Sequence, residues 1–337
     1  MPPPPLSIAA FALTGLAVIG NDALQTLGPF LAANRGRTPR LLQWLWLATL
    51  LTLVLVLGWW RGGGDPAWGR LATFPEARTS WTGLLPALSV LLLTRCGAPV
   101  STSVLVLTAF APASLGPLLR HSLVGYGAGL AAGLLAWGTL LLLNSQAGSG
   151  SGEAEQPGPG ASGAEGSGPR PPWLDTPGAE RLWLSAQWLT TGWLWCQWLV
   201  QDLATIYVVL PRRLSAGAMA GSLVLLLVGL ALILGENGGA IQQRLTRKSR
   251  SDDPRSTAIL TAVYGLVLFG LGRLSSYPLS TTWVFLGLLG GRELALLRLK
   301  ERNAGLVLAD LAGDLLRAAL GMGLSVAVTL AVRHGLA

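Results

Sequence analysis

Long apolar runs with few charges dominate the chain. A helix needs about 20 mostly apolar residues to cross the hydrocarbon core of a bilayer, because each residue adds about 1.5 Å. Six runs reach this length, and we expect each to form one transmembrane helix. They cover residues 6–33, 41–60, 117–143, 182–210, 216–235 and 303–332.

Two further apolar runs, 82–112 and 257–297, are interrupted near the middle by proline, serine and threonine. The pieces on either side have about 12 to 17 residues, or roughly 18 to 25 Å of helix, which is short of a core of about 30 Å. We therefore predict that each run forms a broken, re-entrant helical hairpin. The predicted fold is an all-α polytopic membrane protein.

The composition supports a membrane setting. Of 337 residues, 51% are hydrophobic and 12% are charged, whereas a soluble domain has about 25% charged residues. The net charge of +8 is explained by basic cytoplasmic loops, so we expect no nucleic-acid partner. Two cysteines and two histidines are too few for a disulfide framework or a metal site, and no nucleophile–base set indicates an enzyme.

The low-complexity segment 144–180 is rich in Gly, Ser and Pro and is predicted to be a flexible linker. It separates a first membrane repeat, 1–143 with hairpin 82–112, from a second, 181–337 with hairpin 257–297.

Two motifs recur in both halves at nearly one spacing. Asn21-Asp22 corresponds to Gln201-Asp202, and Pro99-Val100-Ser101-Thr102-Ser103 corresponds to Pro278-Leu279-Ser280-Thr281-Thr282. The aspartates are 180 residues apart and the first serines of the tips are 179 apart. Unrelated motifs rarely recur at one spacing by chance, so the chain is interpreted as an internal repeat.

Basic residues indicate the orientation. With re-entrant hairpins and an outside N-terminus, the inner loops hold 14 Lys and Arg and the outer segments, including Arg70, hold 7. Hairpins that crossed fully would place the basic segments 35–40 and 244–250 on opposite sides. The positive-inside rule therefore favours inverted repeats of about three transmembrane helices plus a hairpin, and we expect a bacterial inner-membrane protein.

An aspartate inside a span costs about 2.5 to 3.5 kcal/mol on insertion scales, so Asp22 and Asp202 should face the protein interior. Carboxylate, amide and hydroxyl oxygens on one helix face are suitable ligands for Na⁺. The alternative is a polar contact that only holds helices together. The candidate cation ligands are Asn21, Asp22, Gln25, Gln201, Asp202 and Thr205.

Proline followed by Ser and Thr suits the start of a second half-helix. Such a start carries about half a positive charge and binds phosphate or sulfate; a proline-kinked helix is the alternative. The candidate anion ligands are Ser101, Thr102, Ser103, Ser280, Thr281 and Thr282, together with Asp22 and Asp202.

Charged residues elsewhere in the apolar runs are open to more than one interpretation. Arg95 and Arg273 could draw an anion inward, pair with the aspartates or extend to the interface. Asp310, Asp314 and Arg317 share a helix face and are interpreted as a self-neutralising cluster rather than a proton relay.

The paired Asn-Asp segments and Pro-Val-Ser-Thr tips together resemble the inorganic phosphate transporter (PiT) family. The resemblance implies inverted repeats, coupling of phosphate to Na⁺ or H⁺, aspartates at the ion sites and tip hydroxyls on the oxyanion. Departures at Gln25, Gln201 and Thr205, where the family has asparagine, mark a divergent, compact member.

We therefore predict cation-coupled symport of inorganic phosphate by alternating access, with hairpin 82–112 gating from outside and 257–297 from inside. Alternatives are a sulfate or other oxyanion permease, a non-coupled anion channel, or a membrane-embedded structural subunit. The expected partners are an inorganic oxyanion and the bilayer, with Na⁺ or H⁺ as the coupling ion and no other cofactor; a homodimer is compatible with this prediction.

Overall fold

The computed structural model describes residues 4–76, 84–95, 100–148, 176–235, 254–275, 277–297 and 304–334. These residues form helices and turns, and no strand occurs among them. The chain is therefore all-α, as predicted. The α-helices are α1 (Pro5–Ala33), α2 (Arg40–Arg61), α3 (Leu85–Arg95), α4 (Thr102–Phe110), α5 (Leu115–Gly148), α6 (Pro177–Tyr207), α7 (Ala216–Gly235), α9 (Pro254–Leu274), α10 (Thr281–Leu296) and α11 (Ala304–His334).

Each of the six apolar runs expected to span the membrane forms a helix: α1, α2, α5, α6, α7 and α11. Among the described residues, five segments are long and apolar enough to cross a bilayer, which supports an integral membrane protein. Four of these segments lie in predicted spans, and the fifth is α9. The five are Pro5–Asp22, Arg40–Arg61, Pro112–Leu142, Ala216–Gly235 and Pro254–Leu274.

The prediction of two short-armed hairpins is wrong for one arm. α3 and α4 have 11 and 9 residues, but α9 has 21 residues and is long enough to cross the core alone. The helix is longer because it begins at Pro254, whose fixed φ suits a first turn, and so includes polar residues ahead of the apolar run.

The predicted linker is also shorter at both ends. α5 continues to Gly148 and α6 begins at Pro177, with Thr176 as its N-cap. The part of the linker between 149 and 175 lies outside the described residues.

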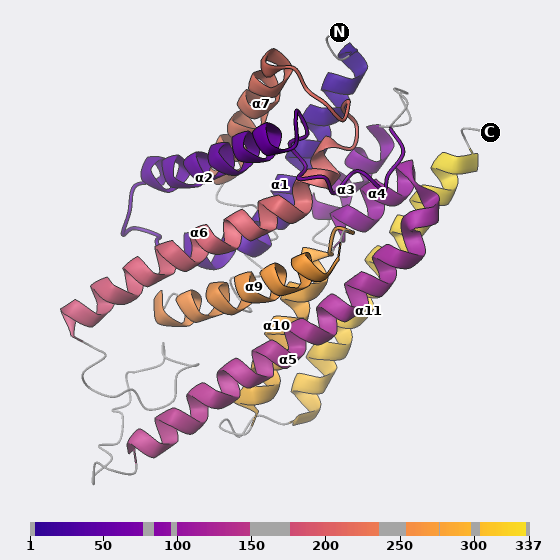
Figure 1. The fold of residues 1–337 in the computed structure, drawn as a ribbon. Coiled ribbons are helices and arrows are strands. Elements are labelled where there is room, and N and C mark those ends of the chain that lie inside the picture. The colour runs from indigo at the N-terminus through magenta and orange to yellow at the C-terminus, as the bar shows by residue number, and fades with distance from the viewer. Residues whose placement is uncertain are drawn as a thin grey trace.

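α1 and α6 lie side by side at the centre and run antiparallel. Phe11, near the start of α1, packs against Tyr207 at the end of α6, with ring centroids 5.0 Å apart. Phe30, near the end of α1, packs against Trp188 near the start of α6, also at 5.0 Å. α2 and α7 flank this pair on one side, and α5, α10 and α11 lie on the other (Figure 1).

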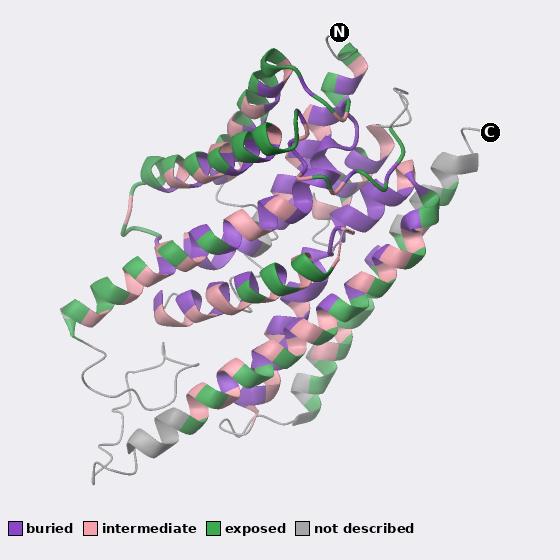
Figure 2. Cartoon of the chain, viewed as in Figure 1, coloured by how far each residue is buried: buried purple, intermediate pink, exposed green. Residues whose placement is uncertain are grey.

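Burial follows the pattern of a membrane protein. The outer faces of α2, α5 and α7 expose large apolar side chains, including Leu53, Leu135 and Val228, whereas buried residues gather where the helices meet (Figure 2). Polar side chains such as Asn21 and Asp202 are fully buried. Because water would favour the opposite arrangement, the outer faces are suited to acyl chains.

α5 and α10 approach closely along a row of glycines. A side-chain carbon at any of four positions would collide with the backbone of the facing helix. Small residues permit such contact between membrane helices, and here the contact sets the position of α10, whose first residues enter the candidate site. The four are Gly129 and Gly133 of α5 and Gly287 and Gly291 of α10.

Candidate functional site

Both hydroxyl-rich tips begin a helix, as predicted. Ser101 is the N-cap of α4, and its hydroxyl oxygen accepts a hydrogen bond from the Val104 N–H at 3.4 Å. Ser280 is the N-cap of α10 but its side chain forms no cap bond. Pro99 lies outside the described residues, whereas Pro278 is buried immediately before the second tip.

Asp22 lies on α1 and is 1% exposed. Its carboxyl group accepts a hydrogen bond from the Thr102 hydroxyl of the first tip and one at 3.4 Å from the Thr282 hydroxyl of the second tip. The neighbouring Asn21 amide adds a third donor at 2.9 Å. One carboxyl group therefore joins the two halves of the chain.

Asp202 on α6 is fully buried and repeats this arrangement. Ser103 of the first tip donates to its Oδ1 at 2.8 Å, and Thr281 of the second tip donates to its Oδ2 at 3.3 Å. Thr102 and Thr281 each bind the aspartate of their own half, whereas Ser103 and Thr282 each bind the aspartate of the other. We call these six residues, Asp22, Thr102, Ser103, Asp202, Thr281 and Thr282, the carboxylate–hydroxyl cluster.

Two main-chain carbonyls also lie at the site, that of Val100 before α4 and that of Thr281 in the first turn of α10. The Val100 carbonyl, just before α4, accepts hydrogen bonds from Asn21 Nδ2 at 2.9 Å and from Thr282 Oγ1 at 3.2 Å. The Tyr264 hydroxyl of α9 donates to the Thr281 carbonyl at 2.8 Å. Main-chain carbonyl oxygens thus lie beside the carboxyl and hydroxyl oxygens of the cluster.

Other predicted ligands lie beside the cluster without joining it. Gln201 Nε2 donates to the Leu268 carbonyl at 3.4 Å. The side-chain oxygens of Gln201, Thr205 and Ser280 are buried and have no hydrogen-bond partner among the described residues. Buried polar atoms without partners are uncommon, so these three have unused capacity for a ligand or water. The side chain of Gln25 lies outside the described residues.

Of the alternatives given for Arg273, pairing with an aspartate is not seen, and a loop residue, Arg70, acts electrostatically on Asp202. Arg273 is exposed and lies over the Phe269 ring, 4.9 Å from its centroid, rather than against an aspartate. Arg70, in the loop after α2, interacts electrostatically with Asp202. Burial lowers the pKa of the Arg70 guanidinium, and the charge of Asp202 opposes this shift. The side chains of Arg95, Asp310, Asp314 and Arg317 lie outside the described residues.

Arg70 was not predicted as a site residue, because in the sequence it is only one basic residue of an outer loop. No local pattern marks it, since its contacts are with residues about 200 positions away. A long-range contact of this kind becomes visible only in the folded chain.

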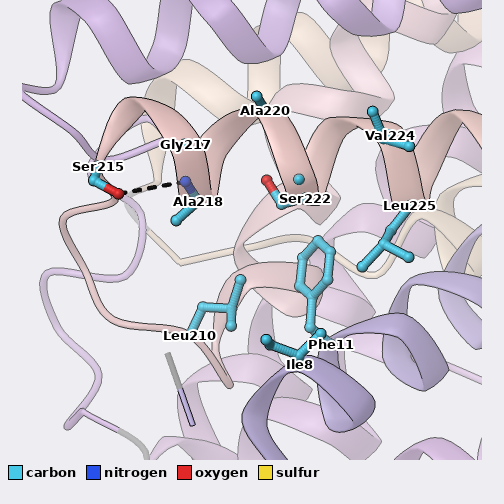
Figure 3. Close-up of a pocket in the computed structure, with 11 residues that line it drawn as sticks. Ile8, Phe11, Leu210, Ser215, Gly217, Ala218, Ala220, Ser222, Val224 and Leu225 are labelled. Atoms are coloured by element: carbon cyan, nitrogen blue, oxygen red, sulfur yellow. Dashed lines mark hydrogen bonds between the residues drawn. The ribbon is translucent and has the colours of Figure 1, made fainter. Parts of the chain in front are cut away.

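A separate cavity of about 900 Å³ lies between the start of α1 and the start of α7 (Figure 3). Its lining is mostly apolar, as with Ile8, Phe11 and Leu225. The Ser215 hydroxyl oxygen there accepts the Ala218 N–H of α7 at 3.3 Å. This cavity is unsuited to an inorganic ion, in contrast to the carboxylate–hydroxyl cluster.

Comparison of the chain with protein-family models, with curated proteins and with solved structures finds no match. The likeness to phosphate transporters is therefore confined to the short motifs quoted above. The function has to be inferred from the geometry of the carboxylate–hydroxyl cluster and its position inside a membrane protein.

Proposed function

We propose that the protein is a secondary active transporter that couples Na⁺ or H⁺ to the movement of inorganic phosphate. The observation that carries this proposal is that two buried carboxyl groups, one from each half, each accept hydroxyl hydrogen bonds from both helix starts. Buried acids inside a membrane protein are costly, and in transporters they mark ion pathways.

A cation fits the chemistry of this cluster. Asp22 and Asp202 are close enough for a negative charge on one to disfavour a negative charge on the other. Two buried negative charges need positive compensation. Carboxylate, hydroxyl and carbonyl oxygens, including that of Val100, are the ligands that hard cations prefer. A proton on one carboxyl group would relieve the same repulsion, so the cluster is suited to either coupling ion.

The same cluster offers an anion site once the carboxyl groups are neutralised. The N-terminal ends of α4 and α10 carry partial positive charge, and the Ser280 hydroxyl is not yet engaged. A hydroxyl group has one proton to donate. For Thr102, Ser103 and Thr281, a hydrogen bond to a carboxylate therefore competes with one to an oxyanion. The Thr282 hydroxyl is already shared between Asp22 and the Val100 carbonyl.

This competition explains coupling. A cation at the carboxyl groups releases the hydroxyls for phosphate, so cation binding raises the affinity for the anion, and phosphate raises the affinity for the cation equally. Without such differential affinity, movement of the two ions would be independent.

Alternating access is supported by the relation between the halves. The corresponding helices α1 and α6 run antiparallel, as inverted repeats require. In addition, each tip donates one hydroxyl hydrogen bond to the aspartate of the other half. We propose that hairpin 82–112 gates from outside and hairpin 257–297 from inside, in a bacterial inner membrane, with the cluster at their meeting point.

The test is uptake of ³²P-phosphate by proteoliposomes under a Na⁺ gradient, a pH gradient or neither. We expect one gradient to drive accumulation of phosphate above equilibrium. Stronger uptake or competition by sulfate would make the protein a sulfate permease, and uptake indifferent to both gradients would make it a channel. The absence of any oxyanion uptake would contradict the proposal.

Removal of one bridging hydroxyl should weaken phosphate binding. Ser103→Ala leaves Asp202 with the hydroxyl donor Thr281, and a hydrogen bond to a charged group is worth about 1.5–3 kcal/mol. In the cation-bound state this hydroxyl would donate to the oxyanion instead, so we expect the phosphate concentration for half-maximal uptake to rise by about 10-fold or more. Ser122→Ala is the matched control, because this buried hydroxyl donates to the Leu118 carbonyl within α5; an equal effect of both changes would contradict the role of Ser103.

A further inference from the structure

The loop of residues 62–76, which follows α2, lies over the break between α9 and α10. The Leu214 N–H donates to the Gly64 carbonyl at 2.9 Å, and Arg212 donates to the Phe74 carbonyl at 3.3 Å. At the break itself, the Phe74 ring packs edge-on against Tyr277, with centroids 5.9 Å apart. The loop is thus held both by the turn before α7 and by the second hairpin.

Arg70 connects this loop to the carboxylate–hydroxyl cluster. Its guanidinium donates to the carbonyls of Gly272 at 3.0 Å and Ser275 at 3.3 Å, where α9 ends. A carbon added at Gly272 would meet both Arg70 and the Gln201 amide. The guanidinium and the Gln201 side chain therefore both lie next to Gly272. Gln201 precedes Asp202, whose charge interacts with Arg70.

Further polar groups continue outward from Arg70. Ser275 Oγ lies 3.2 Å from His121 Nε2, and the His121 ring stacks on Tyr277 with centroids 5.9 Å apart. Polar side chains therefore gather where loop 62–76 meets the end of α9, next to Gln201, the residue before Asp202. Such a group is suited to contact an ion that approaches the cluster from the side on which this loop lies.

We infer that Arg70 is a specificity-determining residue that recognises the transported oxyanion. This inference rests on the proposed function. The guanidinium is a fork of donors that matches two oxygens of phosphate or sulfate. It lies at the end of α9 near the amide of Gln201, the residue before Asp202. Once Asp202 is neutralised, its attraction for Arg70 is lost, and the remaining guanidinium donors pair with the anion instead.

If Arg70 recognises the anion, removal of its side chain should weaken the binding of phosphate and strengthen the binding of the cation. The positive charge of Arg70 attracts phosphate but repels a cation at Asp202. A purely structural role, in which Arg70 only satisfies the carbonyls at the end of α9, would instead impair the binding of both ions together when the side chain is removed.

The experiment measures the half-saturating concentrations of phosphate and of Na⁺ in proteoliposomes, with pH replacing Na⁺ as the variable if wild-type uptake is proton-driven. For Arg70→Gln we expect the phosphate constant to rise at least about 10-fold and the cation requirement to fall. Arg70→Lys keeps the charge but loses the fork, so the phosphate constant should rise with little change for the cation.

Arg212→Gln is the matched control. Arg212 also donates to carbonyls of loop 62–76, but its charge partners are Glu76 and Asp65 rather than Asp202. This variant loosens the same loop and should not produce opposite shifts.

The inference is overturned if both constants rise together in Arg70→Gln, or if Arg212→Gln reproduces the opposite shifts. If Arg70→Gln fails to fold, as judged by size-exclusion chromatography, an unchanged phosphate constant in Arg70→Lys overturns it. A wild-type protein that takes up no oxyanion refutes the proposed function instead, so the two failures are distinguishable.

Discussion

Replacing Asp202 with asparagine is expected to abolish cation-driven phosphate uptake, lowering the initial rate by at least about 100-fold. The Asp202 carboxyl group is buried and is contacted by Ser103 and Thr281, one from each tip. Asparagine has no negative charge to attract a coupling cation and does not take up a proton. Since about 1.4 kcal/mol corresponds to a factor of ten, a 100-fold loss corresponds to about 3 kcal/mol of lost interaction with the coupling ion.

Asp22→Asn should have an equally large effect, because Asp22 holds the equivalent position between Thr102 and Thr282. Asparagine keeps the size of the side chain, so both variants should remain folded and monodisperse. Glu180→Gln is the control: this side chain is 62% exposed and pairs with Arg37 at 3.4 Å, far along α6 from the cluster. Uptake that survives in either aspartate variant would remove that aspartate from the ion site.

A methyl group at Gly129 is expected to destabilise the protein and to stop transport. A carbon at this position collides with the Val284 carbonyl of α10, so the helices must separate. Overpacking of this kind costs about 1–3 kcal/mol and lowers the melting temperature by several degrees. Because α10 begins at Thr281 and Thr282, its displacement also pulls two hydroxyl donors away from the aspartates.

Gly127→Ala provides the control for this prediction, since nothing lies within 4 Å of a carbon at Gly127 on the same helix. Thermal unfolding in detergent, followed by fluorescence-detected size exclusion, should show a lower midpoint for Gly129→Ala and no decrease for Gly127→Ala. Equal midpoints for both variants would show that the close approach of α5 and α10 does not limit stability.

Much of the helical framework follows from local chemistry. Apolar runs long enough to cross a bilayer predict α1, α2, α5 and α7, because an unpaired backbone in lipid must satisfy its hydrogen bonds within a helix. The tips were also predictable, since Ser101 and Ser280 are residues that begin helices after a proline. Even the recurrence of an acid and a hydroxyl tip in each half is a property of the chain read in order.

Local patterns were less informative where a helix boundary depended on a single residue. Proline favours a first turn but also interrupts a helix, and the predicted hairpin began at 257, after Pro254. The structure makes it the first residue of a 21-residue helix. The second hairpin therefore has one arm that is long enough to cross the membrane and one that is shorter.

What the chain determined by itself is which segments are helical and membrane-embedded, and which positions carry acids and hydroxyls. Only the tertiary structure decided that Thr282 donates to Asp22 across 260 positions of sequence, and that Arg70 rather than Arg273 lies within electrostatic reach of Asp202. The reason is physical: helix formation depends on neighbours a few residues away, whereas a hydrogen bond between two halves depends on how whole helices pack.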